Sequence, residues 1–508
     1  MGNAVRQHII EEIRQARYFS MMFDTTPDLA QTEQMSEVIR YVHIHETNVE
    51  IKESFIDFFE IHEKTSKALA TEILSKLDAD GLPVEDCHGQ SYDNAAVMAG
   101  RRTGVQTRIR KKNPRALYIS CDSHSLNLVG VHAAHVDPVM VTFFGTIKRI
   151  FTYFASSTHR WEVMKQHVEL AIKRDCNTRW SSKCDAVEAI CMQIDSVVDA
   201  LEHLQDNTCE NSDTRADAGI LLRNILTFNY LVLLPLWRSV LQAINRIQKR
   251  LQDPKMNFRD AADDILGLKE IVRTRGEQFC VDAMQDGIKK CEEWNVEINR
   301  RTRKRKKMSG ELKADAALTA QEETMRVMKS ALDTIAADLD TRFQQLEYLH
   351  KTFGFLLDTE TLMTADAIDL DDLQRKCTDF ATAFPDDVDS ARLVDEIQDC
   401  RILVSRRVGV DVSPLGILKF TASFGGNDVF PNLKVGLQIL LTVPISVAGC
   451  ERSFSKVKLI MTYLRSTMTE SRLTNLAILS IERETVEQVD FTKVIENFAA
   501  VRARKVLI

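Results

Sequence analysis

The apolar positions in the first third of the chain follow two periodicities. Segments rich in β-branched and aromatic residues predict strands, and these segments are residues 21–24, 33–44, 52–62, 85–93 and 116–121. Leu69, Ile73 and Leu77 recur every fourth residue and predict a helix over residues 65–77. Two further helices are expected over residues 104–112 and 123–134. This order of strands and helices predicts a mixed central sheet covered by helices.

From about Asn177 the pattern indicates helices only, continuing to about Phe384. One apolar stripe is spaced by threes and fours: Leu233, Trp237, Val240, Ile244, Ile247 and Leu251. Pro235 lies in the opening turns of that helix. The helical pattern breaks at residues 300–307, where seven of eight residues are basic. Such a block is typical of a solvated linker, and it could also serve as a nuclear-import signal or contact DNA phosphates.

The last hundred residues predict two apolar helices. We expect Pro444 to start the first of these helices, because a proline in the first turn loses no hydrogen bond. Its apolar stripe is Val447, Cys450, Phe454, Val457, Met461 and Leu464. Glu451 lies beside this stripe. The second helix, over residues 469–482, is a plausible place to meet a second subunit.

Composition narrows the class of protein. Of the 508 residues, 44% are hydrophobic and 27% are charged, which is typical of a globular protein with a sizeable core. The net charge is −7, so any nucleic-acid surface must be local. The most apolar stretch, Tyr230–Trp237, is far shorter than the roughly 20 residues that span a bilayer. We therefore expect no membrane partner.

The cysteines indicate reduced thiols and not a zinc module. There are 11 cysteines, and none forms a CxxC pair. Cys121 and His124 have the spacing of half a zinc site, but the sequence offers no convincing second half. No structural zinc is expected within these 508 residues.

Three acidic residues suggest chemistry on nucleic acid. Asp24 and Asp93 end predicted strands, and Glu451 lies on a predicted helix. Magnesium-type cations prefer carboxylate oxygens, and two such cations can clamp a phosphodiester. Each acid also has a structural interpretation: a turn residue for Asp24, a helix cap for Asp93 and a surface ion pair for Glu451.

A basic segment follows Asp93. Residues 101–115 hold seven Lys or Arg and no acid. On a helix, Val105 and Ile109 would face inward, and four cations would face outward: Arg101, Arg108, Lys111 and Lys112. This arrangement suits a phosphate track, although an ordinary solvated helix face looks the same.

Several long blocks in order resemble hAT-superfamily transposases and, within them, the transposase-derived proteins of the zinc-finger MYM-type-like group. The blocks are residues 18–28, 89–100, 113–134, 157–165, 177–182, 430–460 and 463–482. The resemblance implies a ribonuclease-H-like mixed sheet, an α/β core interrupted by an all-α insertion. It implies the first part of the core (DUF4371-like) over residues 1–176, the helical insertion over 177–400, and the rest of the core with a dimerisation region over 401–508.

The resemblance also implies roles for individual residues. Asp24, Asp93 and Glu451 match the catalytic acids, which would hold Mg²⁺ or Mn²⁺. Cys121 and His124 match a motif that builds the active-site region. Arg179 and Trp180 match a DNA-binding pair whose Trp stacks on a displaced base; a buried anchor for the first insertion helix is the alternative. The implied partners are DNA and a second copy of the chain, and the implied location is the nucleus.

Two functions follow. The first is a metal-dependent transposase that cleaves DNA and transfers strands. The alternative is a domesticated, non-catalytic nuclear protein that dimerises and binds DNA or protein. Family members usually carry an upstream zinc-binding DNA-reading domain that this sequence lacks, which favours the alternative. The intact acids favour the enzyme.

Overall fold

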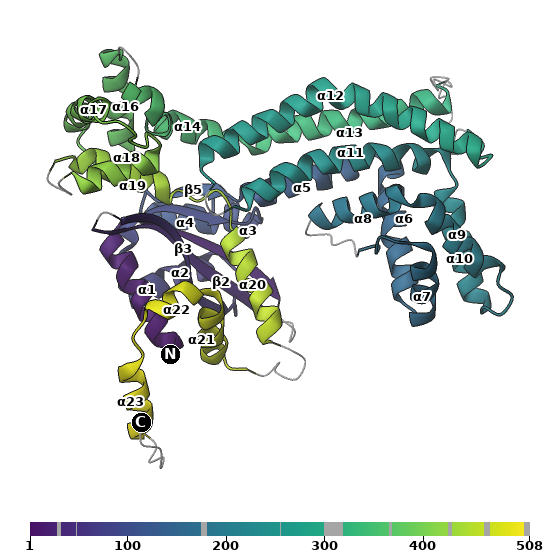
Figure 1. Ribbon diagram of the computed structural model, residues 1–508, viewed down its shortest axis with the longest axis horizontal. Helices are drawn as coiled ribbons and strands as arrows, with labels where there is room; N and C mark the ends of the chain where they lie inside the picture. Colours follow the sequence, from purple (N-terminus) through teal and green to yellow (C-terminus); the bar gives the residue numbers. More distant parts are fainter. Residues whose placement is uncertain are drawn as a thin grey trace. The chain divides into compact units, whose positions relative to one another are not determined.

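The computed structural model describes residues 1–27, 32–46, 48–173, 180–253, 256–298, 318–364, 368–424, 429–461 and 468–501. The chain folds into two compact units, each built from separate segments (Figure 1). The first unit comprises Met1–His124, Leu251–Ala262 and Gln344–Ile508, and the second comprises Ser125–Arg250 and Asp263–Phe343.

The first unit is built on a five-stranded mixed sheet with strand order β3-β2-β1-β4-β5. The strands are β1 (Phe19–Pro27), β2 (Glu33–His45), β3 (Asn48–Glu60), β4 (Cys87–Tyr92) and β5 (Leu117–Ser120). Strands β1, β2 and β3 pair antiparallel, whereas β4 and β5 continue the sheet in parallel with β1. All five strands were predicted from their apolar content, and the predicted fold class is confirmed.

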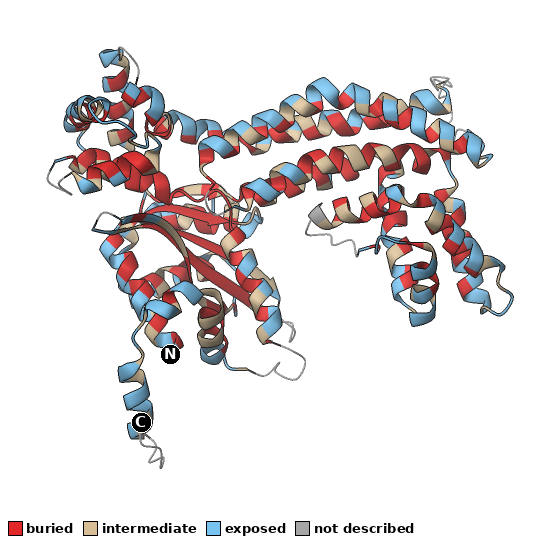
Figure 2. Ribbon diagram, viewed as in Figure 1, coloured by how far each residue is buried: buried red, intermediate tan, exposed pale blue. Residues whose placement is uncertain are grey.

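Helices cover both faces of this sheet. Successive side chains of a strand point to opposite faces. On one face, Tyr41 of β2 donates a 2.7 Å hydrogen bond to Glu12 of α1 (Gly2–Ala16). On the other face, Arg40 donates a 3.0 Å bond to the Leu441 carbonyl of α19 (Pro431–Thr442). The sheet is consequently buried on both sides, and its strands are mostly red in Figure 2.

The α1 face carries the predicted early helices. They are α2 (Ser66–Ala79) and α4 (Val105–Lys112). Two short helices between them along the chain, η1 (Val84–Asp86) and α3 (Ala96–Ala99), were not predicted. The inward residues of α2 and α4 are buried in one core with the strands, as their spacing predicted: Leu69, Ile73, Leu77, Val105 and Ile109.

The second unit and the adjoining first-unit segments are helical. The helices up to the second long helix are α5 (Asp122–Ala134), α6 (Pro138–Ala155), α7 (Thr158–His167), α8 (Trp180–Met192), α9 (Ile194–Asp206), α10 (Ser212–Ile225), α11 (Phe228–Leu251) and α12 (Phe258–Glu293). Next comes α13 (Ala320–Arg342). Helix α12 packs closely against α11: a Cβ on Gly287 would lie 2.8 Å from the Cα of Val232. Only glycine permits this approach of the two backbones.

The rest of the chain returns to the first unit as helices. They are α14 (Gln344–Leu357), α15 (Thr359–Thr364), α16 (Leu370–Ala383), α17 (Ser390–Ser405), α18 (Pro414–Ser423), α19, α20 (Ala448–Ile460), α21 (Glu470–Ile481), α22 (Arg483–Gln488) and α23 (Thr492–Val501). Four of them contact the sheet directly: α18, α19, α20 and α21.

These units divide the chain at places other than the predicted boundaries of 176/177 and 400/401. The compact units change over at 124/125 and 343/344, with a further return over Leu251–Ala262. Helices α6 and α7 pack on α9 and α10, and α14 packs on α16 and α19. The first predicted boundary followed the end of the strand-like pattern and the second followed the resemblance, and neither reports such packing between helices.

The C-terminal prediction was wrong about the start of the first helix, and the structure limits which side of the second helix can meet another subunit. Helix α20 begins at Ala448 and not at Pro444, because the intervening backbone bonds elsewhere: Ile445 O accepts from Asp122 N at 3.0 Å. The apolar side of α21 is also used within the chain, since Leu473 and Ile478 are buried in the core of the sheet. That side is therefore not a free surface for a second subunit.

Among the described residues, no single helix is long and apolar enough to cross a membrane. Two bent pairs, α5 with α6 and α10 with α11, reach that length and composition only together.

Candidate functional site

Asp24 lies within β1, and Asp93 directly follows β4, the adjacent parallel strand, at the same level. Met22 of β1 pairs with Ser91 of β4. Counting two residues further along each strand reaches Asp24 and Asp93. Alternation along the strands places both on the face of Met22, which is the face covered by α19 and α20. Both residues are half-buried, and Asp93 Oδ1 accepts a 3.2 Å hydrogen bond from Ala95 N, which is an Asx turn and not the predicted helix cap, because the N-cap of α3 is Ala95.

Glu451 lies in the first turn of α20, which packs on that same face. Its neighbour Cys450 donates from Sγ to the Met22 carbonyl at 3.4 Å. Ser453, one turn further into the helix, is 2.7 Å from Ser36 between hydroxyl oxygens. Ser36 is the residue of β2 that pairs with Asp24. The sheet and α20 thus bring all three predicted acids to one end of one face.

Cys121 joins the start of α5 to the start of α20. Its buried sulfur accepts backbone N–H groups from His124 and Val447, each at 3.4 Å. Burial raises the pKa of this thiol, and the nearby charge of Glu451 adds to the rise. The thiol therefore stays neutral and serves as an acceptor at the N-termini of both helices. His124 is half-buried.

Asp122, which follows Cys121, is buried, and burial raises its pKa well above the ordinary value. One of its carboxylate oxygens, Oδ2, has no hydrogen-bond partner among the described residues. This position suits a neutral carboxyl and not a ligand of a hydrated cation.

The arrangement of the acids does not amount to a ready-made metal site. Within the described ranges, which include Asp24, Asp93 and Glu451, no three His, Cys, Asp or Glu side chains are placed to hold one ion together. The metal-binding role that the resemblance implied for these three carboxylates remains a prediction.

The predicted basic helix is present as α4. Arg101, Lys111 and Lys112 are exposed as predicted. Arg108 is less available to a phosphate than these three residues, because its Nε donates to the Thr103 carbonyl at 3.1 Å and to Ser66 Oγ at 3.3 Å. It ties the turn before α4 to the start of α2.

Three residues of this region were missing from the predicted set. Arg110, Tyr118 and Tyr348 line a pocket between α4, β5 and α14. Arg110 belongs to the basic block and could have been included. Tyr118 had only a strand pattern to mark it, and Tyr348 comes from a helix more than 200 residues later in the chain.

Two further predictions fall at the edge of what the structure describes. Arg179 lies outside the described residues, as does the basic block at residues 300–307. Trp180 is the first residue of α8 in the second unit, and its side chain lies outside the described part. Their roles with DNA remain predictions.

A mixed sheet of this order, with two level acids on adjacent parallel strands and a helix-borne third, defines a ribonuclease-H-like core. Comparison with known families agrees. Residues 1–104 match the family described as the ZMYM1/FAM200 RNase-like domain (DUF4371). Residues 402–485 match the hAT family C-terminal dimerisation region. These two matches lie at the two ends of the chain and agree with the resemblance to hAT-transposase-derived proteins.

Two curated relatives extend along nearly the whole chain. They are the human and the mouse "52 kDa repressor of the inhibitor of the protein kinase" (Homo sapiens and Mus musculus). Each is 21% identical over 96% of this chain. The chain spans 64% of the human relative and 65% of the mouse relative, which is less than two thirds of either.

Proposed function

We propose that this protein is a transposase-derived DNA-binding protein that associates with itself through its C-terminal region and acts in the nucleus. One observation carries the DNA part. Arg101, Arg110 and Lys111 gather around α4, and among the described residues no carboxylate lies within 4.0 Å of them. In a chain of net charge −7, such uncompensated cations form a local surface for phosphates.

Self-association is supported by the dimerisation region matched over residues 402–485. A role in binding and not in cutting is supported by two facts. The acids do not form a common ion site in this structure. The human and mouse relatives are named as repressors.

The test is fluorescence anisotropy of the full chain with a labelled DNA duplex, beside light scattering for its mass. The expected result is salt-sensitive binding by a dimer or larger species. The double variant Arg101→Gln with Lys111→Gln should bind at least several-fold more weakly. Arg392→Gln on α17 removes an exposed cation elsewhere in the same unit and should bind like the wild type. Equal binding by both variants would remove the support that α4 gives.

The nuclear location is tested separately by microscopy of the tagged chain. The basic block at residues 300–307 is the proposed import signal. Changing its Lys and Arg residues to Gln should move the protein to the cytoplasm. Unchanged nuclear signal would show that another segment directs it.

A second candidate function is metal-dependent DNA cleavage by Asp24, Asp93 and Glu451. The level placement of the two aspartates beside the helix of the glutamate favours it. A divalent cation would supply activation of water and stabilisation of the leaving oxygen.

Cleavage is tested by incubating the full chain with Mg²⁺ or Mn²⁺ and DNA that carries the terminal repeats of its own element. Metal-dependent cutting that is lost in Glu451→Gln would establish the enzyme. No cutting, with DNA binding intact, would leave the binding function alone.

A further inference from the structure

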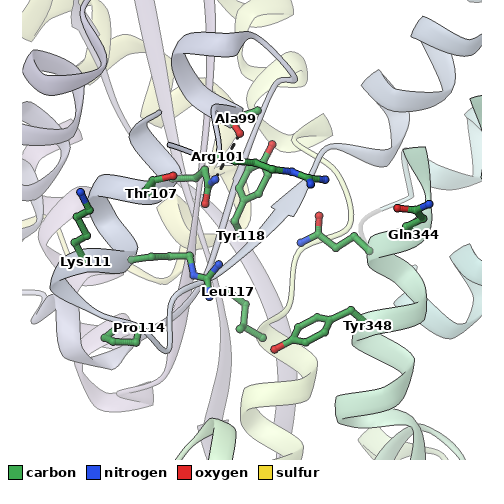
Figure 3. Close-up of a pocket in the computed structure, with 12 residues that line it drawn as sticks. Ala99, Arg101, Thr107, Lys111, Pro114, Leu117, Tyr118, Gln344 and Tyr348 are labelled. Atoms are coloured by element: carbon green, nitrogen blue, oxygen red, sulfur yellow. Dashed lines mark hydrogen bonds between the residues drawn. The ribbon is translucent and has the colours of Figure 1, made fainter. Parts of the chain in front are cut away.

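A pocket opens at the outer edge of the sheet in the first unit. Strand β5 is the last strand of the sheet, and the pocket lies between it, α4 and α14 (Figure 3). Its volume is about 700 Å³, within the roughly 300–1,000 Å³ of small-ligand sites. Gln345 of α14 accepts the Ser120 N–H of β5 at 3.4 Å, so α14 is anchored to the strand and closes one side.

One side of the pocket is positively charged. Arg101, Arg110 and Lys111 line it, and no carboxylate of the described residues is within 4.0 Å of these groups. Figure 3 shows Arg101 reaching across the opening toward α14. Gln106 of α4 donates to the Ala99 and Gly100 carbonyls at 3.5 and 3.4 Å, which ties the backbone just before Arg101 to the helix that carries Arg110 and Lys111. An anionic group would find several donors here and no repelling acid in the lining.

The other side of the pocket offers aromatic rings. Tyr348 projects from α14 toward Leu117 of β5 and is 50% exposed, so its ring is accessible to a ligand (Figure 3). Tyr118 of β5 lies with its ring 6.1 Å from the ring of buried Tyr92. Its hydroxyl is buried and has no hydrogen-bond partner among the described residues. Burial raises the pKa of Tyr118, and the charge of Asp93 adds to the rise, so the pocket lies within electrostatic range of the acids.

Phosphate-binding cations opposite flat aromatic rings suit a nucleotide better than a simple anion. A phosphate alone would leave the tyrosine rings unused, and an apolar ligand would leave the cations without a partner. A base inside a duplex is already stacked and cannot enter such a pocket. An unpaired base can stack on a ring while its phosphates contact Arg or Lys.

We propose that this pocket binds an unpaired nucleotide of a DNA strand, with its base against Tyr348 and its phosphates on Arg101, Arg110 and Lys111. The proposal rests on the proposed DNA-binding function and adds the kind of DNA it prefers, namely a duplex with a single-stranded end. Gln344 of α14, which also lines the pocket, supplies an amide that can hydrogen-bond a base edge.

The experiment compares two labelled DNAs on the full chain by anisotropy: a blunt duplex, and the same duplex with a five-nucleotide thymine overhang. Tyr348→Ala removes the exposed ring, and Tyr348→Phe keeps it as the matched control. Because Tyr348 is half exposed, both variants should fold. Arg110→Gln tests the charged side, and free thymidine monophosphate tests whether one nucleotide alone is bound.

The wild type is expected to bind the overhang DNA more tightly than the blunt duplex. Tyr348→Ala should lose about 10-fold in affinity for the overhang DNA, the size of one stacking contact, and bind the blunt duplex as before. Tyr348→Phe should retain the preference, and Arg110→Gln should weaken it. Competition by the free monophosphate at millimolar concentration would support the pocket further.

Three results would overturn the proposal. The wild type could bind both DNAs equally, or Tyr348→Ala and Tyr348→Phe could behave alike, or Tyr348→Ala could weaken both DNAs to the same degree. In each of these cases DNA binding itself survives. If the wild type binds neither DNA, the proposed function fails and the pocket proposal fails with it.

Discussion

At the scale of single residues, Glu37 of β2 is the most unusual acid in the sheet. It is fully buried, and neither carboxylate oxygen has a hydrogen-bond partner among the described residues. Burial raises its pKa from 4.5 to about 8, and the charges of Asp80 and Asp57 add to the rise while Lys76 and Arg6 oppose it. The folded chain therefore holds a proton here at neutral pH that the unfolded chain releases.

This proton predicts a specific pH dependence. Because the folded pKa lies above the unfolded value, stability should fall as the pH rises from about 4.5 to about 8. Glu37→Gln should flatten that fall and gain on the order of 1–4 kcal/mol at pH 8. Urea unfolding at pH 5, 7 and 8 measures it, with exposed Glu63→Gln as the matched control. If the free energy of unfolding changed with pH in the same way in Glu37→Gln and in the wild type, the prediction would be wrong.

A second residue-scale feature is the buried carboxylate of Asp387. It accepts from His88 Nε2 at 2.9 Å and from Arg115 Nη1 at 3.0 Å. Burial alone would raise its pKa, but these two partners lower it below the ordinary value of 3.8. The group links β4 to the segment between α16 and α17.

Asp387→Asn should lower the free energy of unfolding at pH 7 by about 2–4 kcal/mol, because His88 and Arg115 would lose the negatively charged oxygen to which they donate. The pKa of Asp387 is lower in the folded chain than in the unfolded chain. Its contribution to the free energy of unfolding is therefore complete above the unfolded-state pKa and is lost as the pH falls through the folded-state pKa. The difference from wild type should therefore shrink below about pH 4. Asp386→Asn is the control: that carboxylate also reaches Arg115, at 3.3 Å, but is 78% exposed and should matter little.

At the scale of elements, the contact between α5 and α20 positions Glu451. The Cys121 sulfur accepts a hydrogen bond from a backbone N–H group at the start of each helix. Helix N-termini otherwise leave such donors unsatisfied, and a buried donor without a partner is costly.

Cys121→Ala should destabilise the chain by about 1–3 kcal/mol beyond its cavity cost and speed hydrogen exchange at the Val447 and His124 amides. Cys377→Ala provides the comparison, since it is equally buried in α16 and is 0% exposed. Similar losses in both variants, with no change in exchange at the two amides, would mean that the sulfur only fills space.

At the scale of the whole molecule, a net charge of −7 must coexist with a DNA-binding surface. The proposed surface is confined to α4 and its flanks, so binding should depend strongly on salt. Each phosphate contact contributes a slope of about −0.9 in log affinity against log salt for duplex DNA, and about −0.7 for a single strand.

Replacing Arg110 and Lys111 by Gln should therefore make that slope shallower by about one for each lost contact. Anisotropy titrations at 50, 100 and 200 mM salt would measure it. If the slope of log affinity against log salt were the same in the double variant and the wild type, the phosphate contacts would have to lie elsewhere, for example on the second unit.

The local elements of this protein follow from its sequence. Strands, early helices and the inward faces of α4 and α20 were predictable because apolar periodicity is a property of neighbouring residues. The resemblance to hAT-derived proteins was also readable, because the long blocks that carry it occur in order, and family matches at both ends of the chain agree with it.

Long-range features required the folded chain. Asp24 and Asp93 lie at the same level of the sheet only because of the register in which β1 pairs with β4. The Cys121 sulfur accepts a hydrogen bond from Val447, which is 326 residues away in the sequence. The pocket joins α4 to Tyr348 of α14, and the start of α20 moved past Pro444 because its backbone groups bond to another segment. Spacing along a sequence determines which side of an element is apolar. Only packing decides which distant polar groups meet, because those contacts depend on how the elements fill space together.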